Sequence, residues 1–261
     1  MTHNTAAIRT IDLLGVFWRS FFIQASWSYD RLQSLGFAFA LIPILRRLYP
    51  DREMFTGRLA AHMEYFNTQP YLASFVLGAA ARAEEDRATG RNAAADVEEL
   101  KKNLMAPLGA LGDSFFWGSL KPFAASASVA VLLTGAWWAP LLFLVLYNIV
   151  HVGLRLNLVF VGYKTEGDVV ALMSRYNFTR LARRYKVLSL AIIGCIVGTL
   201  SAWGPEFRTP VSVFPPLLAA AGLALTLGMI ALMRLGASPV KIMIGLAAAC
   251  LILVLALGGF A

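Results

Sequence analysis

Three long stretches of this sequence contain no Asp, Glu, Lys or Arg, and their length limits what the chain can fold into. They cover residues 187–205, 209–233 and 242–261. Each is close to the roughly 20 residues with which an α-helix crosses a bilayer. A fourth charge-free run, 122–150, is too long for one simple crossing. The sequence therefore predicts an all-α, polytopic integral membrane protein.

Composition supports this class and argues against others. Charged residues make up 15% of the chain, against about 25% in soluble domains. The net charge of +8 does not indicate nucleic-acid binding, because the basic residues lie in short segments between apolar runs, as on the cytoplasmic side of membrane proteins. Residues 155–186, with seven Lys/Arg and two acidic residues, are therefore assigned to the cytoplasm. No Walker A loop, GxSxG, HExxH or metal-spaced cluster occurs, so we expect no catalytic residue, metal or cofactor.

We expect the chain to have three parts. In residues 1–60, apolar residues recur at helical spacing with single charges between them, which predicts amphipathic helices in the membrane interface or packed on another membrane protein. Residues 61–165 form the second part, and 166–261 form the C-terminal transmembrane helices. Within the second part, 82–102 has eleven charges in 21 positions, which predicts a solvated cytoplasmic helix–turn–helix with its break at Gly90.

The segment "LMAPLGALGDSFFWGSLKPF", residues 104–123, is apolar but contains three glycines and two prolines around Asp113. Irregular backbone at membrane depth must be satisfied by protein or by a water-filled cavity. The segment therefore predicts a re-entrant hairpin that lines a cavity. Short hydrophobic segments interrupted by Gly and Pro are typical of a transporter's substrate site.

The densest polar cluster of the chain, "HMEYFNTQP" at residues 62–70, directly precedes an apolar run. It supplies one carboxylate and two carboxamides, those of Glu64, Asn67 and Gln69. A carboxamide both donates and accepts hydrogen bonds, so it matches a substrate hydroxyl. Pro70 disfavours the α region at the preceding residue, so the cluster lies at a helix break. The alternative is that Asn67 and Thr68 only cap a helix that begins at Pro70.

Several segments together resemble the IID membrane subunit of the mannose/fructose/sorbose family of the bacterial phosphotransferase system. They keep the family's order and cover most of residues 12–165 and the C-terminal helices; they are "GVFWRSFFIQASWSYDRLQSLGFAFALIPILRRLYP", "HMEYFNTQPYLASFVLGAAARAEE", "KKNLMAPLGALGDSFFWGSLKP", "LLFLVLYNIVHVGLR" and "SPVKIMIGL". The resemblance implies a multi-pass subunit of the bacterial inner membrane. With a IIC partner it would form the path of a mannose-type hexose, in a homo-oligomer of IIC–IID pairs within the lipid bilayer.

The resemblance also implies that soluble IIA and IIB components carry the phosphate, which comes from phosphoenolpyruvate. This chain would then belong to a phosphotransferase complex without being its phosphocarrier. A different interpretation is a non-transport scaffold or sensory subunit of a reduced phosphotransferase set.

Taken with the resemblance, residues 61–165 become a substrate-holding core, and we expect the carboxylate and carboxamides of its polar cluster to contact the sugar. Asp113 either binds sugar hydroxyls or caps backbone amides of the hairpin turn. At membrane depth its carboxylate needs a partner, for which Arg155, Lys121 and groups on IIC are candidates. Trp117 either stacks on a sugar face or packs at an interface.

Two features depart from the family pattern. The external loop between the last two helices is shortened to about "GPEFRTPVSVFPP", and His151 stands where arginine is common. Asn148, His151 and Arg155 follow one another at offsets of three and four, so they share one helix face. Polar groups on one face of an apolar helix point to a partner or a cavity rather than to lipid. His62 is interpreted as a structural or IIC-interface residue.

Overall fold

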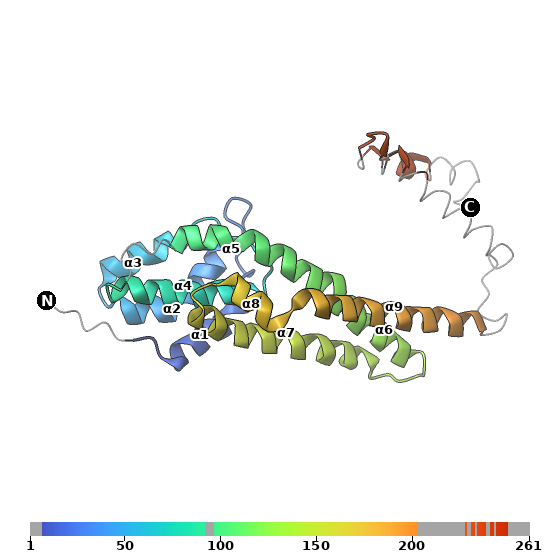
Figure 1. The fold of residues 1–261 in the computed structure, drawn as a ribbon, viewed down its shortest axis with the longest axis horizontal. Coiled ribbons are helices and arrows are strands. Elements are labelled where there is room, and N and C mark those ends of the chain that lie inside the picture. The colour runs from blue at the N-terminus through green and yellow to red at the C-terminus, as the bar shows by residue number, and fades with distance from the viewer. Residues whose placement is uncertain are drawn as a thin grey trace, which may run out of the picture. The chain divides into compact units, whose positions relative to one another are not determined.

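The computed structural model describes residues 7–91 and 97–202, with 228, 231–232, 234–238, 241–242 and 244–249. The shortened loop "GPEFRTPVSVFPP" and most of the predicted spans 209–233 and 242–261 lie outside these residues. Within them the regular elements are helices and no strand occurs, which confirms the all-α class (Figure 1). Two helical runs, Val97–Leu132 and Ala139–Lys164, have the length and apolar composition of membrane spans.

The chain divides into two compact units, Met1–Val197 and Gly198–Ala261, and the description that follows concerns the first. The described helices are, in chain order, α1 (Thr10–Ser20), α2 (Ser34–Leu48), α3 (Arg52–Ala61), α4 (Ala73–Ala88), α5 (Val97–Gly112), the π-helix η1 (Asp113–Leu120), α6 (Lys121–Leu132), α7 (Ala139–Lys164), α8 (Val169–Tyr176) and α9 (Phe178–Ala202). The helices expected in residues 1–60 are present as α1, α2 and α3.

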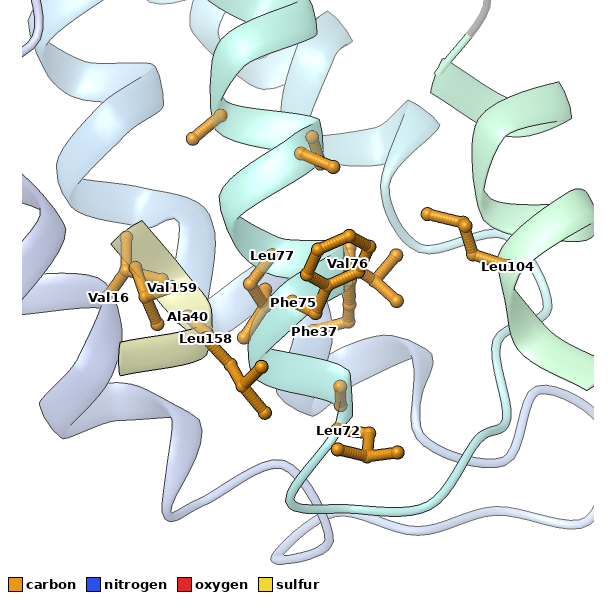
Figure 2. Close-up of a cluster of buried hydrophobic side chains, with 14 of the residues drawn as sticks. Val16, Phe37, Ala40, Leu72, Phe75, Val76, Leu77, Leu104, Leu158 and Val159 are labelled. Carbon is orange, nitrogen blue, oxygen red and sulfur yellow. The ribbon is translucent and has the colours of Figure 1, made fainter. Parts of the chain in front are cut away.

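Helix α4 lies at the centre of the core. Its residues 73–81, "ASFVLGAAA", are apolar or small on every side, and all of them are buried. A helix with this pattern has to be surrounded by other helices. Figure 2 shows Phe75, Val76 and Leu77 of α4 among side chains of α1, α2, α5 and α7, with Val16, Phe37, Leu104 and Leu158 labelled.

The backbones of α4 and α7 touch at two glycines. A Cβ atom placed on Gly78 would overlap the carbonyl oxygen of Val159, and one placed on Gly162 would overlap that of Phe75. Small residues allow such close approach between helices. The contact fixes the register of α7 against α4, and with it the position of the polar face of α7.

Residues 104–123 do not form the predicted re-entrant hairpin. Instead α5, η1 and α6 follow one another without reversal as one helical run, Val97–Leu132 (Figure 1). The irregularity is taken up by the π-helical turns of η1, which shift the hydrogen-bond register without ending the helix. Gly112 serves close packing rather than a turn, because a Cβ atom there would lie 2.6 Å from Cβ and Cγ of Gln69.

The charged segment 82–102 is a helix, a turn and a helix, as predicted. Helix α4 ends at Ala88, Gly90 has a φ of +73°, and α5 begins at Val97, while 92–96 lie outside the described residues. The expectation that this segment is solvated throughout is wrong for three of its charges. Glu84, Glu85 and Lys101 are all buried.

Candidate functional site

The polar segment 62–70 connects α3 to α4 and is fixed from two sides. The Gln33 carboxamide, next to the start of α2, donates from Nε2 to the carbonyl oxygen of Thr68 (2.8 Å) and accepts from the Thr68 N–H at Oε1 (3.2 Å). The Thr68 hydroxyl donates to the carbonyl oxygen of Met105 in α5 (2.9 Å). These bonds hold an irregular stretch of backbone in one conformation, which a binding site needs.

Gln69 caps the turn that leads into α4. Its Oε1 accepts hydrogen bonds from the N–H groups of Tyr71 (2.8 Å) and Leu72 (3.1 Å). The break at Pro70 is therefore capped by Gln69 and not by Asn67 or Thr68, the residues that the capping alternative named. The Gln69 Nε2 is buried and has no hydrogen-bond partner among the described residues.

The side chains of Glu64 and Asn67 are exposed on this fixed segment. No described residue forms a hydrogen bond or ion pair with either side chain. The backbone N–H of Asn67 approaches the Met105 sulfur at 3.2 Å, which leaves its carboxamide free. Glu64 lies close enough to the buried Lys101 to interact with it electrostatically.

Asp113 and Trp117 are exposed one turn apart on η1. Within the described part of the chain, neither Arg155 nor Lys121 pairs with Asp113. Gln69 of the polar segment reaches the start of η1, where its Cβ and Cγ lie against Gly112, the residue directly before Asp113. The predicted site residues thus form two exposed groups with a buried carboxamide beside the second.

Of the predicted polar face of α7, His151 and Arg155 are buried inside the protein, and Asn148 is exposed. The His151 ring stacks on Tyr71 with centroids 4.4 Å apart, and His151 Nε2 lies 2.7 Å from Asn148 Oδ1. The Arg155 guanidinium donates to the Ser20 hydroxyl (3.1 Å) and to its carbonyl oxygen at the C-terminus of α1. A cation at a helix C-terminus compensates the unpaired carbonyls there, so Arg155 is committed to α1 rather than to Asp113.

A buried carboxylate that sequence reasoning missed lies behind the polar segment. Glu84 of α4 is fully buried and has three partners. Tyr49 donates its hydroxyl to Oε2 (2.8 Å), Arg58 forms an ion pair with both oxygens, and His62 Nε2 lies 2.9 Å from Oε1. This set of groups, the Glu84 cluster, joins α2, α3 and α4.

The charges of the Glu84 cluster are set by burial and by these bonds. Burial opposes ionisation of Glu84, but the hydrogen bonds from His62 and Arg58, with the charge of Arg58, outweigh it and lower the pKa of Glu84 to about 2. Burial lowers the pKa of His62, so we assign a neutral imidazole that donates its Nε2–H to the carboxylate. Burial and the Glu84 carboxylate raise the pKa of Tyr49, which stays a donor.

The Glu84 cluster therefore has a structural role, and His62 belongs to it. Spacing along α4 is the signal that could have located it, because Glu84 follows the buried Leu77 and Ala80 at offsets of seven and four. Within the described ranges no three His, Cys, Asp or Glu side chains converge as a metal site.

An all-α fold with two apolar helical runs of membrane-spanning length fits the class of membrane proteins. The family model described as "PTS system mannose/fructose/sorbose family IID component" matches residues 7–258. This chain belongs to that family. The mannose-specific EIID component of Escherichia coli (strain K12) is 36% identical over 192 residues, which cover 71% of this chain and 66% of that protein. The sorbose-specific EIID component of Klebsiella pneumoniae is 33% identical over 189 residues, which cover 71% and 68%.

The sequence match thus spans just under two thirds of the length of the Escherichia coli relative. Two solved structures extend the likeness. A chain of the mannose transporter ManYZ in complex with microcin E492 is 30% identical, with a TM-score of 0.58, and 97% of this chain and 98% of that chain are covered. A second structure, described as a membrane protein, has the same identity and coverage and a TM-score of 0.69.

Proposed function

We propose that this chain is the IID subunit that, with a IIC partner, forms the sugar path of a phosphoenolpyruvate-dependent phosphotransferase system for mannose-type hexoses. The observation that carries this is the match to the mannose transporter chain, which extends over 97% of this chain and 98% of that one. In this proposal the protein is multi-pass in the bacterial inner membrane. Soluble IIA and IIB components supply the phosphate, and the complex is a homo-oligomer of IIC–IID pairs.

In this proposal residues 61–165 are the substrate-holding core, between the N-terminal helices of 1–60 and the C-terminal transmembrane helices of 166–261. Glu64 and Asn67 contact the sugar hydroxyls. Two observations support that role: both side chains are exposed and unpaired among the described residues, and the Gln33–Thr68 bonds hold their backbone fixed. A rigid backbone with free polar side chains lowers the entropy cost of binding.

Asp113 and Trp117 form the second part of the proposed sugar site. The Asp113 carboxylate accepts hydrogen bonds from sugar hydroxyls, and the Trp117 indole stacks on a sugar face. Their exposure and their place in a π-helix support this, because π-helical turns recur at functional sites. Gln69, which packs against Gly112 directly before Asp113, contributes the unpaired donor Nε2. The remaining contacts would come from IIC.

The proposal excludes a phosphocarrier role for the two described histidines. His62 is buried against Glu84, and His151 is stacked on Tyr71. Both imidazoles are thus held by internal contacts, as expected if the phosphate is carried on the soluble components.

Uptake of labelled mannose into vesicles that hold this chain, its IIC partner and the soluble components tests the proposal. A hydrogen bond to a charged group contributes about 1.5–3 kcal/mol, and one between neutral groups contributes about 0.5–1.5 kcal/mol. Glu64→Gln should therefore raise KM about tenfold or more, and Asn67→Ala about two- to tenfold. Glu53→Gln, which removes an exposed carboxylate of α3, is the control and should leave uptake unchanged.

Two results contradict different parts of the proposal. Unchanged uptake and affinity in Glu64→Gln and Asn67→Ala would remove the site assignment but leave the function standing. A wild-type complex that takes up no hexose when phosphoenolpyruvate is supplied would remove the function itself.

A further inference from the structure

A groove of about 250 Å³ lies between the first turn of η1, with the end of α5, and the first half of α9. Its apolar lining consists of Leu111, Phe178 and Ala182. Leu111 belongs to α5, and the other two belong to α9. The groove is therefore separate from the Glu84 cluster and from the exposed side chains of Glu64 and Asn67.

The polar lining of the groove is cationic and hydroxylic. It consists of the hydroxyls of Ser114 and Thr179 and the cations of Arg183 and Lys186. No described residue forms an ion pair with either cation, and the sequence contains no Asp or Glu from 169 to 202. Two cations that share a groove without an acidic partner attract an anion to it.

The groove lies at the level beyond which neither of its two flanking helical runs contains a charged residue. Helix α9 runs parallel to η1 and α6, and the residues in contact keep a nearly constant separation in the sequence. The contacts are Phe115–Phe178 (5.2 Å between ring centroids), Phe123–Tyr185 (5.0 Å between ring centroids) and Ser126 Oγ–Ser189 Oγ (3.3 Å). Lys186 therefore lies at about the level of Phe123. Beyond that level neither 122–132 nor 187–202 contains a charged residue. Cations that lie next to a charge-free, membrane-facing section of helix are placed where the phosphates of lipid headgroups lie.

We propose that this groove binds a phosphate ester, and that the headgroup of an anionic phospholipid is its occupant. The two cations neutralise the phosphate, and the hydroxyls of Ser114 and Thr179 donate to its oxygens. The apolar lining receives the glycerol and the first acyl carbons, and the acyl chains then follow the charge-free section of α6 and α9. A soluble phosphate ester shares the headgroup chemistry but cannot use the charge-free section. The groove shares no lining residue with the proposed sugar site, although Ser114 directly follows Asp113.

The test counts lipids bound to the full chain, purified from its membrane in mild detergent with its associated subunits. Native mass spectrometry would follow titration with phosphatidylglycerol and, separately, with phosphatidylcholine. The variant Arg183→Gln/Lys186→Gln should lose phosphatidylglycerol affinity about thirtyfold, since each cation at an anionic surface contributes roughly a factor of five. The control Arg180→Gln/Arg184→Gln removes the same charge from α9 outside the groove and should lose less than about threefold.

A second variant and a second probe separate the remaining interpretations. Ser114→Ala/Thr179→Val keeps every charge, and a severalfold loss of phosphatidylglycerol supports the site even if the charge variant does not fold. Glycerol 3-phosphate, added to protein in phosphatidylcholine, should protect against heating less than phosphatidylglycerol does. Protection by glycerol 3-phosphate alone, lost in Arg183→Gln/Lys186→Gln, would support phosphate-ester binding and overturn the lipid as its source. Equal losses in the two charge variants, or no preference for either probe, would overturn the groove as a phosphate site.

Discussion

Replacement of Glu84 by Gln tests whether the ionised carboxylate of the Glu84 cluster stabilises the fold. The substitution keeps the shape of the side chain and an oxygen that accepts hydrogen bonds, but it removes the charge that Arg58 neutralises. The pKa of Glu84 is about 2 in the folded protein, against an ordinary value of 4.5. At about 1.4 kcal/mol for each tenfold change in proton affinity, this difference corresponds to roughly 3 kcal/mol of stability near neutral pH.

The pH dependence of this stabilisation has a defined sign. Because the folded pKa lies below the unfolded one, the stabilisation is complete above about pH 4.5 and is lost as pH falls toward 2. The difference in unfolding free energy between wild type and Glu84→Gln should therefore shrink from ~3 kcal/mol at pH 6 to ~1 kcal/mol at pH 3.

Thermal unfolding in detergent, followed by tryptophan fluorescence at several pH values, measures this difference. A loss of ~3 kcal/mol lowers Tm by roughly 6–12 °C in a chain of this size. Glu53→Gln, an exposed carboxylate on α3, should change stability by less than about 1 kcal/mol at any of these pH values. A Glu84→Gln protein as stable as wild type at pH 6, or a difference that stays constant between pH 6 and pH 3, would refute the reasoning.

Two further substitutions test the packing of α4 and the conformation of the polar segment. Gly78→Ala places a Cβ atom against the carbonyl oxygen of Val159, so it should lower the stability by about 1–3 kcal/mol and lower Tm. The control Gly57→Ala, in the open interior of α3, should be neutral or slightly stabilising. Equal Tm values for the two variants would show that α4 and α7 separate at no cost. Gln33→Leu removes both bonds to Thr68 and should raise amide hydrogen exchange at residues 64–69 by about tenfold or more, while unchanged exchange would mean that other contacts hold the segment.

The sequence predicts the fold class and the helix break because both depend on local composition. Charge-free runs require helices in a bilayer, and Pro70, directly after a polar cluster, disfavours the α region at Gln69. The path of residues 104–123 depends on packing instead. Glycine in a sequence does not reveal whether it permits a turn or a close contact, and Gly112 is required by the nearness of Gln69. A pattern of residues thus predicts that a backbone is irregular but not which irregular form it takes.

The Glu84 cluster was missed for a related reason. A charged run is normally solvated, and composition alone cannot show that Glu84 faces Arg58 and His62, which precede it by 26 and 22 residues. Only the helical period of α4 carries that information, because it continues the buried face through the charged residues. The exposure of Asp113 could not be foreseen either, since it follows from a continuous helix rather than the expected hairpin.

Tyr71, which no sequence pattern distinguishes, connects the parts of the proposed sugar site. Its N–H bonds to Gln69, its ring packs edge-on against Phe116 of η1 at 4.7 Å, and the same ring stacks on His151. A shift of η1 or of α7 would therefore reach the polar segment through one side chain. His151 supplies a planar group that stacks on Tyr71, and Arg155 places a cation over the same ring (5.3 Å). Two side chains of α7 thus hold Tyr71 from its ring, and its N–H connects them to the polar segment through Gln69.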